Sequence, residues 1–360
     1  MWKAEQDGNQ VKLTSGNGPL INYQVEGVEL PQLSDHSFVV WHALPTAMLT
    51  GRDIEIDGPV DPVVIANGEK LSRIWAMWSP GVLRPVKISA SKVVSPQRGE
   101  RAVIALYSGG VDSTYHLISA HKLDLPSHAL TIHGMDYKPD NDNKFRALIE
   151  KTEPLLKNFG IRRITIRTDV ARYGKAGILH GFTLAGCAGL LSDVFGTAQI
   201  AADYTWEQDM MSWPWGTNHV TNRYFAGSDW SVRTVTSDHS RTEKIGAIAK
   251  SKMACDAISF CTDSKSRPHN CGRCAKCVRT KLMFLIATGS IPPIFTDNTY
   301  RPAMLGRINL KKCKERAFFA DIYSHAVACG REQYIPGLGA KLEAVDLSPR
   351  LRIKRLFGLT

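Results

Sequence analysis

From residue 101 onwards the chain alternates short apolar runs with longer stretches whose apolar positions recur every three or four residues. The short runs are typical of strands buried on both faces, and the longer stretches are typical of amphipathic helices. This alternation predicts an α/β protein with a doubly wound parallel sheet. The predicted strands are Ala102–Leu106, Ala129–Ile132, Arg163–Ile166, Gln199–Ala202 and Val232–Thr236.

A helical pattern follows four of these strands after an intervening segment, whereas Gln199–Ala202 leads into Asp203, Tyr204 and a long polar stretch. We expect helices over Asp112–Lys122, Asn143–Phe159, Ile178–Phe195 and Thr242–Ala254. Ligands of doubly wound sheets bind outside the carboxyl ends of the strands. The polar segments at those ends, which read SGGVDS, HGMD, ADY and SDHSRTEK, should therefore converge on one cleft.

The first 96 residues have a different pattern, in which short apolar runs are separated by Gly, Pro and Asp. This spacing is typical of strands joined by turns. We predict strands over Leu20–Val25, Phe38–Trp41, Ile54–Ile56 and Val82–Val93, and helices over His42–Leu49 and Leu71–Trp78. The expected organisation is an N-terminal β-rich accessory domain (1–96), a linker over Gln97–Glu100, a nucleotide-binding α/β domain with a cysteine cluster (101–290) and a basic, mainly helical C-terminal extension (291–360).

The formal net charge of +11 is unevenly distributed along the 360 residues. Residues 1–100 contain 9 Lys and Arg against 11 Asp and Glu, whereas residues 301–360 contain 12 against 5. A basic C-terminal part is compatible with a nucleic-acid partner. We favour the alternative, solvated helix faces around an enzyme with an anionic substrate.

The apolar runs do not reach the length of a membrane span, and the first residues lack a basic and apolar signal pattern. We therefore expect a cytoplasmic protein that does not contact a membrane. A homo-oligomer is compatible with the sequence, which does not specify the oligomeric state.

The segment SGGVDS, at Ser108–Ser113, joins the first strand of the alternating region to its helix. Gly109 and Gly110 allow the backbone to approach a ligand closely and to take positive φ. Asp112 or Ser113 can cap the helix. The backbone N–H groups of such a helix start, together with serine hydroxyls, predict a phosphate site. A Walker-type lysine is missing, so this turn is not a P-loop for γ-phosphate transfer.

In its strand–turn–helix context, SGGVDS resembles the signature of the PP-loop (N-type) ATP pyrophosphatase family. The resemblance implies an adenine nucleotide alpha hydrolase-like fold, cleavage of ATP between the α and β phosphates, and Mg²⁺ as a cofactor. It implies catalytic roles for Ser108, Asp112 and Ser113. It also implies nucleotide contacts for Leu106, Tyr107, Ser108, Gly109, Gly110, Val111, Asp112, Ser113, His133 and Asp136, although His133 and Asp136 also fit an ordinary turn after a strand.

Two later segments belong to the same predicted edge of the sheet. Residues 206–230 form a long polar and glycine-containing stretch with four tryptophans, at positions 206, 213, 215 and 230. It fits either a loop for a flat substrate or an Ω-loop packed on its own tryptophans. Arg241 and Lys244 lie at a helix start, where cations oppose the helix dipole, so they face either an anion or solvent.

The cysteine spacing predicts a metal site. A C-x2-C-x2-C motif lies within residues 271–277, and another cysteine precedes it with nine residues between. Four thiolates close a tetrahedral zinc site without an open position for catalysis. The predicted Zn²⁺ ligands are Cys261, Cys271, Cys274 and Cys277. Free thiols, an iron–sulfur cluster, or Cys255 as the fourth ligand are the alternatives. Lys276 and Arg279 would offset the thiolate charge.

Over about residues 101–288, the combination of SGGVDS, AADY and the late cysteine cluster resembles the 7-cyano-7-deazaguanine synthases. This resemblance implies an ATP-dependent carbon–nitrogen ligase. Such an enzyme adenylates a small-molecule carboxylate, releases pyrophosphate, and passes the acyl group to ammonia or an amine while AMP leaves.

Two other functions remain open at this stage. The basic C-terminal part favours a tRNA-modifying, thiolating PP-loop enzyme, whereas a closed zinc site disfavours it because sulfur transfer requires a reactive thiol or an open cluster. A non-catalytic nucleotide-binding interaction module is the third hypothesis, which the intact SGGVDS disfavours.

Overall fold

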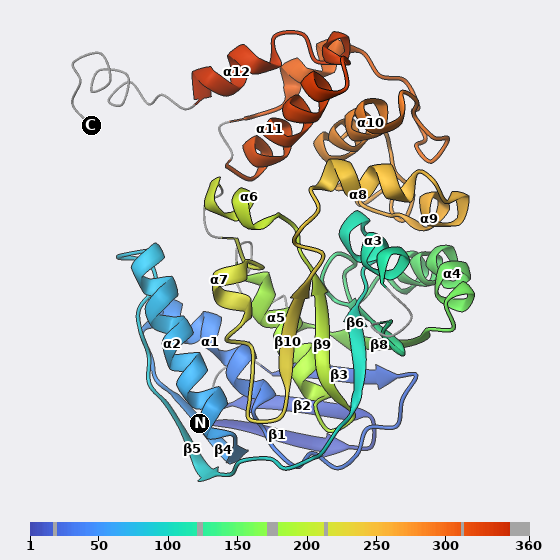
Figure 1. Ribbon diagram of the computed structural model, residues 1–360. Helices are drawn as coiled ribbons and strands as arrows, with labels where there is room; N and C mark the ends of the chain where they lie inside the picture. Colours follow the sequence, from blue (N-terminus) through green and yellow to red (C-terminus); the bar gives the residue numbers. More distant parts are fainter. Residues whose placement is uncertain (17–19, 121–124, 171–178, 212–214, 311–312, 346–360) are drawn as a thin grey trace, which may run out of the picture.

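The computed structural model describes residues 1–16, 20–120, 125–170, 179–211, 215–310 and 313–345. Their centre is a ten-stranded mixed sheet with the order β10-β9-β6-β7-β8-β3-β2-β1-β4-β5 (Figure 1). The strands are β1 (Trp2–Asp7), β2 (Gln10–Ser15), β3 (Ile21–Glu26), β4 (Ile54–Val60), β5 (Ile88–Val93), β6 (Ala102–Leu106), β7 (His128–His133), β8 (Arg162–Thr168), β9 (Phe195–Ala201) and β10 (Ser231–Val235).

The predicted five-stranded parallel sheet is confirmed as one half of this larger sheet. β10, β9, β6, β7 and β8 are parallel neighbours in that order. The chain builds outward from β6 through β7 to β8, and then returns to the other side of β6 as β9. The order therefore reverses between β6 and β9, and such a switch point is where doubly wound sheets bind their ligands.

The N-terminal strands continue the same sheet. β3 pairs antiparallel with β8, β2 lies between β3 and β1, and β4 and β5 add in parallel beyond β1. The predicted strand over Phe38–Trp41 is wrong, because these residues begin helix α1 (Phe38–Thr50), which also contains the predicted helix His42–Leu49. Sequence analysis had not predicted β1 and β2.

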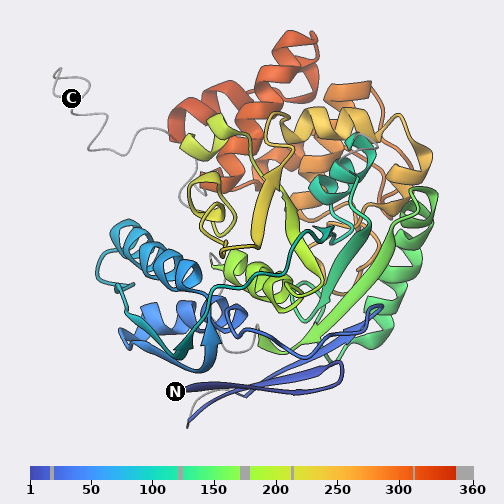
Figure 2. The ribbon, with the colours of Figure 1, turned by 60° about the horizontal axis from the view of Figure 1, so that its bottom comes forward.

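Helices cover both faces of the sheet (Figure 2). On β6, Ile104 and Leu106 belong to one apolar core, and Ala105 and Tyr107 belong to the core on the opposite face. The first core is shared with α1, α2 (Pro62–Trp78) and α5 (His180–Leu190). The second is shared with α3 (Val111–Ser119), α4 (Asp142–Asn158), α8 (Arg241–Ile248), α9 (Lys252–Ala257), α10 (Ala275–Thr288) and α11 (Cys313–Ala328). The two faces thus support the doubly wound description.

Several predicted boundaries differ from the observed ones. The helix predicted over Thr242–Ala254 is two helices. α8 ends at Ile248, and α9 begins at Lys252 with Ser251 as its N-cap. The strand predicted over Val82–Val93 is regular only from Ile88, since Pro85 lacks an N–H for the ladder. The helix predicted over Ile178–Phe195 is α5, and Phe195 already begins β9.

The described part of the C-terminal region is helical, as predicted. After α10 the chain forms 3-10 turns over Pro302–Arg307 and Glu332–Tyr334, α11, and α12 (Leu338–Val345). Two short helices, α6 (Trp206–Met211) and α7 (His219–Asn222), complete the fold. Among the described residues we find no helix with the length and hydropathy that crossing a membrane requires.

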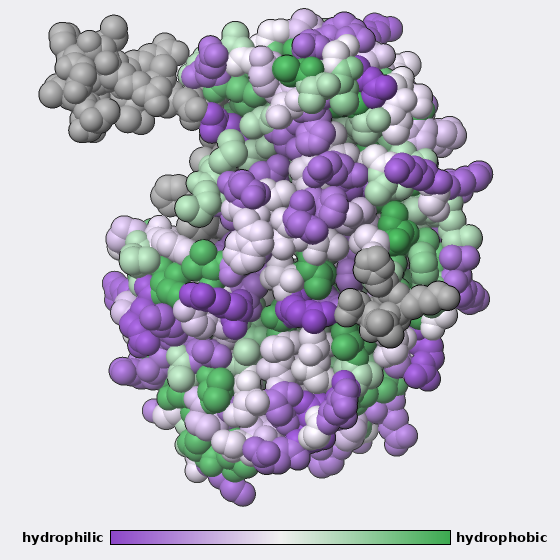
Figure 3. Space-filling model, viewed as in Figure 1, coloured by the Kyte–Doolittle hydropathy of each residue, from purple (hydrophilic) through white to green (hydrophobic). Residues whose placement is uncertain are grey.

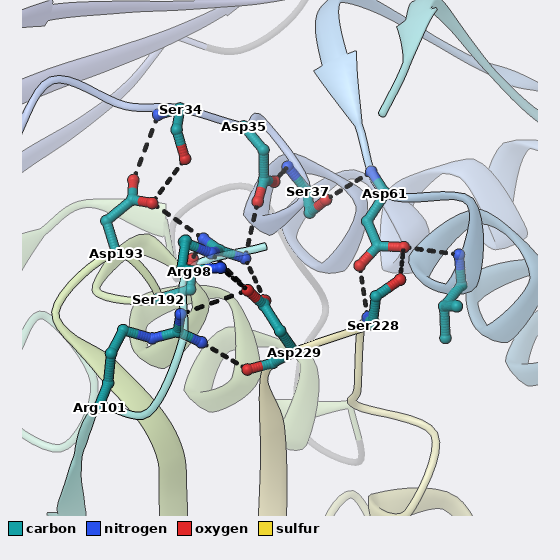
Figure 4. Close-up of polar contacts among 11 residues, drawn as sticks. Ser34, Asp35, Ser37, Asp61, Arg98, Arg101, Ser192, Asp193, Ser228 and Asp229 are labelled. Carbon is teal, nitrogen blue, oxygen red and sulfur yellow. Dashed lines mark hydrogen bonds and ion pairs between the residues drawn. The ribbon is translucent and has the colours of Figure 1, made fainter. Parts of the chain in front are cut away.

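A buried ion network ties the predicted linker to the amino ends of the parallel strands (Figure 4). Arg98 forms ion pairs with Asp35, Asp193 and Asp229 at 3.1, 3.0 and 2.7 Å. Arg101 adds a contact of 3.3 Å to Asp229. These carboxylates come from the N-terminal region, from the loop before β9 and from the loop before β10. The network therefore fastens the N-terminal region to the edge of the sheet opposite the predicted ligand site.

Candidate functional site

The SGGVDS turn lies at the switch point of the sheet. Gly109 has φ of 71°, and a Cβ there would lie 2.9 Å from Cγ2 of Thr152, so both the backbone and the packing require glycine. α3 begins after Gly110, and its N-terminus has no side-chain cap from the residues that the structure describes. Ser108 Oγ lies 3.4 Å from Ser113 Oγ and accepts the N–H of Gly110 at 3.2 Å. The hydroxyls of Ser108 and Ser113 thus lie beside the free N–H groups of the helix start, and this combination of donors suits an anion.

The residues that flank the SGGVDS turn have buried side chains and offer main-chain atoms to a ligand. Leu106, Tyr107 and Val111 are buried in the two apolar cores. The N–H of Tyr107 donates to the carbonyl of Leu130, and its carbonyl accepts the hydroxyl of Thr131 at 2.9 Å. Their side chains therefore fix the turn, and a contact between these residues and a nucleotide would involve main-chain atoms.

Asp112 is the centre of an ion network that joins three segments of the predicted edge. Arg241, the first residue of α8, contacts both oxygens of Asp112, with Nε at 3.2 Å from Oδ1. The same guanidinium lies 3.2 Å from Oδ1 of Asp203, which follows β9. Lys244 is fully buried and lies 3.4 Å from Asp112, and it donates to the carbonyl of Ala202 at 2.7 Å. The ends of β6 and β9 and the start of α8 thus meet, as the sequence predicted.

The electrostatics of this network follow from burial and from neighbouring charge. Burial alone would raise the pKa of Asp203, but Arg241 and the hydroxyl of Thr217 lower it overall. Thr217 and the indole of Trp215 donate to Asp203 at 2.7 and 3.0 Å. Burial lowers the pKa of Lys244 despite the nearby Asp112. Arg241 and Thr217 therefore favour the ionised form of Asp203.

The C-terminal helix α11 forms a wall of the same site, which sequence analysis did not predict. The guanidinium carbons of Arg241 and Arg279 lie 4.2 and 3.9 Å from the ring centre of Phe318. Arg279 also forms an ion pair with Glu315 at 2.8 Å. Asp321 accepts the N–H and the hydroxyl of Thr242 at the start of α8. α11 therefore fixes the position of the arginine that binds Asp112.

A capping box forms the start of α8. Ser240 accepts the N–H of Glu243, and the Glu243 carboxylate accepts the N–H of Ser240 at 2.7 Å. This S-x-x-E pattern marks a helix start. It agrees with the predicted position of Arg241 at a helix start, and the structure makes Arg241 the first residue of α8.

The second predicted segment, HGMD, lies in the turn between β7 and α4. The buried ring of His133 stacks on Phe145 with ring centres 4.2 Å apart, and its Nε2 lies 2.8 Å from the carbonyl of Lys138. Asp136 is exposed and lies 3.4 Å from the guanidinium of Arg267. His133 thus contacts residues of its own turn and of the following helix, whereas Asp136 faces the loop that carries the cysteines.

The four predicted metal ligands are brought together. The sulfur atoms of Cys261, Cys271, Cys274 and Cys277 all lie within 4.8 Å of one another. The Cys261–Cys274 and Cys271–Cys277 pairs are separated by 3.9 and 3.8 Å. A tetrahedral Zn²⁺ with Zn–S bonds of about 2.3 Å would hold its sulfurs about 3.8 Å apart. The donor set and its spacing therefore fit zinc, and Cys255 is not part of the cluster.

This cysteine cluster is attached directly to the glycine turn. The N–H of Ser259, two residues before Cys261, donates to the carbonyl of Gly109 at 2.7 Å. Arg267 donates to the carbonyl of Cys261 at 2.6 Å and also contacts Asp136. A metal held here would brace the loop that positions the turn.

Two lysines near the cysteines have different environments. Lys281 is buried, donates to the carbonyls of Gly272 and Thr299 at 2.8 and 2.7 Å, and interacts electrostatically with Cys277 and Cys271. Burial lowers the pKa of Lys276, and the charges that act most strongly on it are Asp136, Arg279 and Arg241. Lys281 is thus a further cation close to the cysteines, besides Lys276 and Arg279, to which the sequence assigned the offset of thiolate charge.

The tryptophans of residues 206–230 do not form one aromatic surface. Trp230 belongs to the apolar core, Trp215 binds Asp203, and Trp213 lies outside the described residues. Trp206 is 58% exposed, and Met210 and Met211 of the same helix are also exposed. On the face shown in Figure 3, hydrophobic residues form small separate patches among hydrophilic ones. Of the three tryptophans that the structure describes in this stretch, Trp215 is the one that joins the ion network.

Comparisons of the chain with protein-family models, with curated proteins and with solved structures found no match. The chemistry of the site is consequently judged from its own residues.

Proposed function

We propose that this protein is an ATP-dependent, AMP-forming carbon–nitrogen ligase of the PP-loop type. The proposal rests on one observation: the N-terminus of α3 is uncapped by any side chain, is flanked by the hydroxyls of Ser108 and Ser113, and lies at the switch point of the sheet. Helix starts of this kind attract phosphate through their free N–H groups and the helix dipole. The motif resemblance to PP-loop pyrophosphatases supports the same ligand.

The proposed reaction proceeds in two displacements. A carboxylate oxygen of the substrate attacks the α-phosphorus of ATP, the bond to the bridging oxygen of the β-phosphate breaks, and pyrophosphate leaves. The nitrogen of ammonia or an amine then attacks the acyl carbon, loses a proton, and AMP leaves. The two steps need positioning and charge stabilisation and no covalent enzyme intermediate.

The chain supplies groups for each requirement. The start of α3 with Ser108 and Ser113 would hold the pyrophosphate group, and Arg241 and Lys244 would offset its developing charge. Mg²⁺, when bound, would neutralise phosphate oxygens, with Asp112 as the carboxylate placed to hold it. Zn²⁺ on the four cysteines would have a structural role, since four protein ligands leave no position for substrate.

A product assay tests this proposal. ATP labelled at the α-phosphate is incubated with Mg²⁺, an amine donor and a panel of carboxylic acids, and AMP is separated from ADP. We expect AMP and pyrophosphate, and a loss of about 100- to 1,000-fold in Ser108→Ala, the cost of removing one donor at such a site. Ser119→Ala, at the other end of α3, is the matched control and should retain activity. Formation of ADP and phosphate would contradict the proposal.

The two other hypotheses from the sequence predict different results. A thiolating enzyme would form AMP only with tRNA and a sulfur donor. A non-catalytic module would bind ATP without turning it over with any acid, amine or tRNA.

A further inference from the structure

His180, the first residue of α5, is a titratable side chain attached to the ion network around Asp203. α5 connects β8 to β9, so its first turn lies at the carboxyl ends of the parallel strands. The ring of His180 packs against that of Trp215 with ring centres 4.9 Å apart, and its Nε2 lies 3.3 Å from the hydroxyl of Thr217. Both partners donate to Asp203, so His180 contacts the two residues that hold this carboxylate.

The second residue of α5 allows the segment before α7 to lie directly against the helix start. A Cβ on Gly181 would lie 1.9 Å from the carbonyl oxygen of Gly216, far inside van der Waals contact. Glycine is therefore the residue that fits this position without displacing the segment. Because Trp215 and Thr217 flank Gly216, this close approach fixes their distance from His180.

The hydrogen bonds of Thr217 specify which nitrogen of His180 carries a proton. The hydroxyl group has a single proton and lies 2.7 Å from Oδ2 of Asp203, which in its ionised form only accepts. Thr217 therefore donates to Asp203 and accepts from His180, so that Nε2 is the protonated nitrogen of the ring. In the neutral ring, Nδ1 then carries the lone pair and is the nitrogen that takes up a proton.

A continuous chain of polar contacts joins this histidine to the glycine turn. Arg241 contacts Asp112 within the turn and lies 3.2 Å from Asp203. Asp203 in turn accepts the hydroxyl that binds His180. α5 packs on one face of the sheet, and α8, which begins with Arg241, packs on the other. Since the crevice of a switch point lies between the helices of the two faces, His180 and Arg241 border the proposed nucleotide site from opposite faces.

We propose that His180 is the general base of the second displacement, a role that rests on the proposed ligase function. As the nitrogen of ammonia or the amine bonds to the acyl carbon, the bond from that carbon to the phosphate oxygen breaks, and its electron pair leaves with AMP. The proton lost by the nitrogen passes to Nδ1 of His180 and from there to solvent. The imidazolium keeps its hydrogen bond to Thr217 and is stabilised by the charge of Asp203.

The two half-reactions separate this role from nucleotide binding. Exchange of labelled pyrophosphate into ATP reports adenylation, and it is measured with the acid found in the product assay and without a nitrogen donor. Amide formation with the amine donor of that assay reports the second displacement. The variant is His180→Gln, which keeps an N–H donor for Thr217 but has no basic nitrogen. We expect exchange within about twofold of the wild type and amide formation slower by about 100-fold or more, the usual contribution of a general base.

Two further measurements keep the test independent of folding and of turnover. His128→Gln is the matched control, because His128 begins β7 and lies at the opposite edge of the sheet; both half-reactions should stay unchanged. In the wild type with 15N-labelled histidine, the NMR signals that disappear in His180→Gln should show a neutral ring with a proton on Nε2 and none on Nδ1. The exchange rate itself shows whether the variant is folded.

Three results would overturn the role of His180 while the proposed function still holds. These are an equal loss of both half-reactions in His180→Gln, no loss in either half-reaction, and a neutral ring that carries its proton on Nδ1. Formation of ADP by the wild type, without any pyrophosphate exchange, would instead overturn the proposed function and this role with it.

Discussion

Replacing Arg98 by methionine should destabilise the protein strongly without touching the proposed nucleotide site. The side chain of Arg98 is 14% exposed, and those of its partners Asp35, Asp193 and Asp229 are 4%, 10% and 17% exposed. Arg98→Met leaves three partly buried carboxylates close together, and among the described residues Arg101 is the cation that remains paired with one of them. Breaking a buried ion pair by removing one partner costs about 3–5 kcal/mol.

Because some solvent reaches these groups, we expect the lower end, a loss of about 3 kcal/mol in the free energy of unfolding. With an unfolding entropy of about 2 cal/mol/K per residue, this corresponds to a fall in Tm of about 4 °C for a chain of this size. The control is Arg73→Met. Arg73 is 54% exposed and pairs with Glu69 at 3.8 Å, so its replacement should cost about 0.5 kcal/mol or less.

The loss in Arg98→Met should also depend on pH. Burial acts to raise the pKa of Asp229, but Arg98 lowers it to about 2, and burial raises the pKa of Asp35. A carboxylate with a lowered pKa contributes stability above its unfolded pKa, and this contribution disappears as pH falls through the folded value. Without Arg98 the carboxylates are easier to protonate, so the deficit of the variant should shrink as pH falls below about 4.

Urea unfolding followed by circular dichroism and by tryptophan fluorescence, at neutral and acidic pH, measures both effects. A single transition is expected by both probes, because β3 pairs with β8 and the N-terminal helices share a core with the parallel sheet. A loss in Arg98→Met no larger than that in Arg73→Met would refute the reasoning. So would a deficit that stays constant with pH.

Two further predictions concern the metal and a titrating pair. Elemental analysis should find no zinc in Cys274→Ser and one zinc per chain in Cys255→Ser. Hydrogen exchange of Cys274→Ser should show local unfolding around residues 259–277, because metal binding and local folding are linked. An iron–sulfur chromophore in the wild type would contradict this prediction. His325, hydrogen-bonded to Asp321, has a pKa raised to about 9. The charged His325 therefore contributes its full stabilisation below its unfolded pKa, and this stabilisation is lost as pH rises through about 9. By urea unfolding, His325→Gln should be less stable than the wild type at pH 6 and equally stable above pH 9.

What the sequence predicted well was encoded locally. The run before Ser108, the two glycines and the following helix fixed a strand–turn–helix unit within about fifteen residues. The cysteine cluster was likewise predictable, because three ligands lie within seven positions and metal geometry restricts the fourth. The start of α8 was also predictable, because the S-x-x-E pattern of Ser240 and Glu243 is a local signal for a helix start.

What the sequence did not predict depends on contacts between distant segments. Arg241 binds Asp112 across 129 residues and Asp203 across 38, and no local pattern encodes either pair. α1 was mistaken for a strand at its start because it is apolar nearly all round, with most of its residues buried. A short apolar run cannot by itself distinguish a buried strand from a buried helix.

The two ion networks of the sheet differ in a way that indicates where a ligand binds. At the amino edge, Arg98 and Arg101 have carboxylate partners at 2.7–3.3 Å and face a small excess of acidic groups. At the carboxyl edge, the start of α3 has no side-chain cap among the described residues, and the hydroxyls of Ser108 and Ser113 lie beside it. Free N–H groups at a helix start attract anions, so an external anion would bind at this edge. Substitutions at the amino edge should accordingly change stability at constant ATP affinity, and those at the carboxyl edge should change ATP affinity at nearly constant stability.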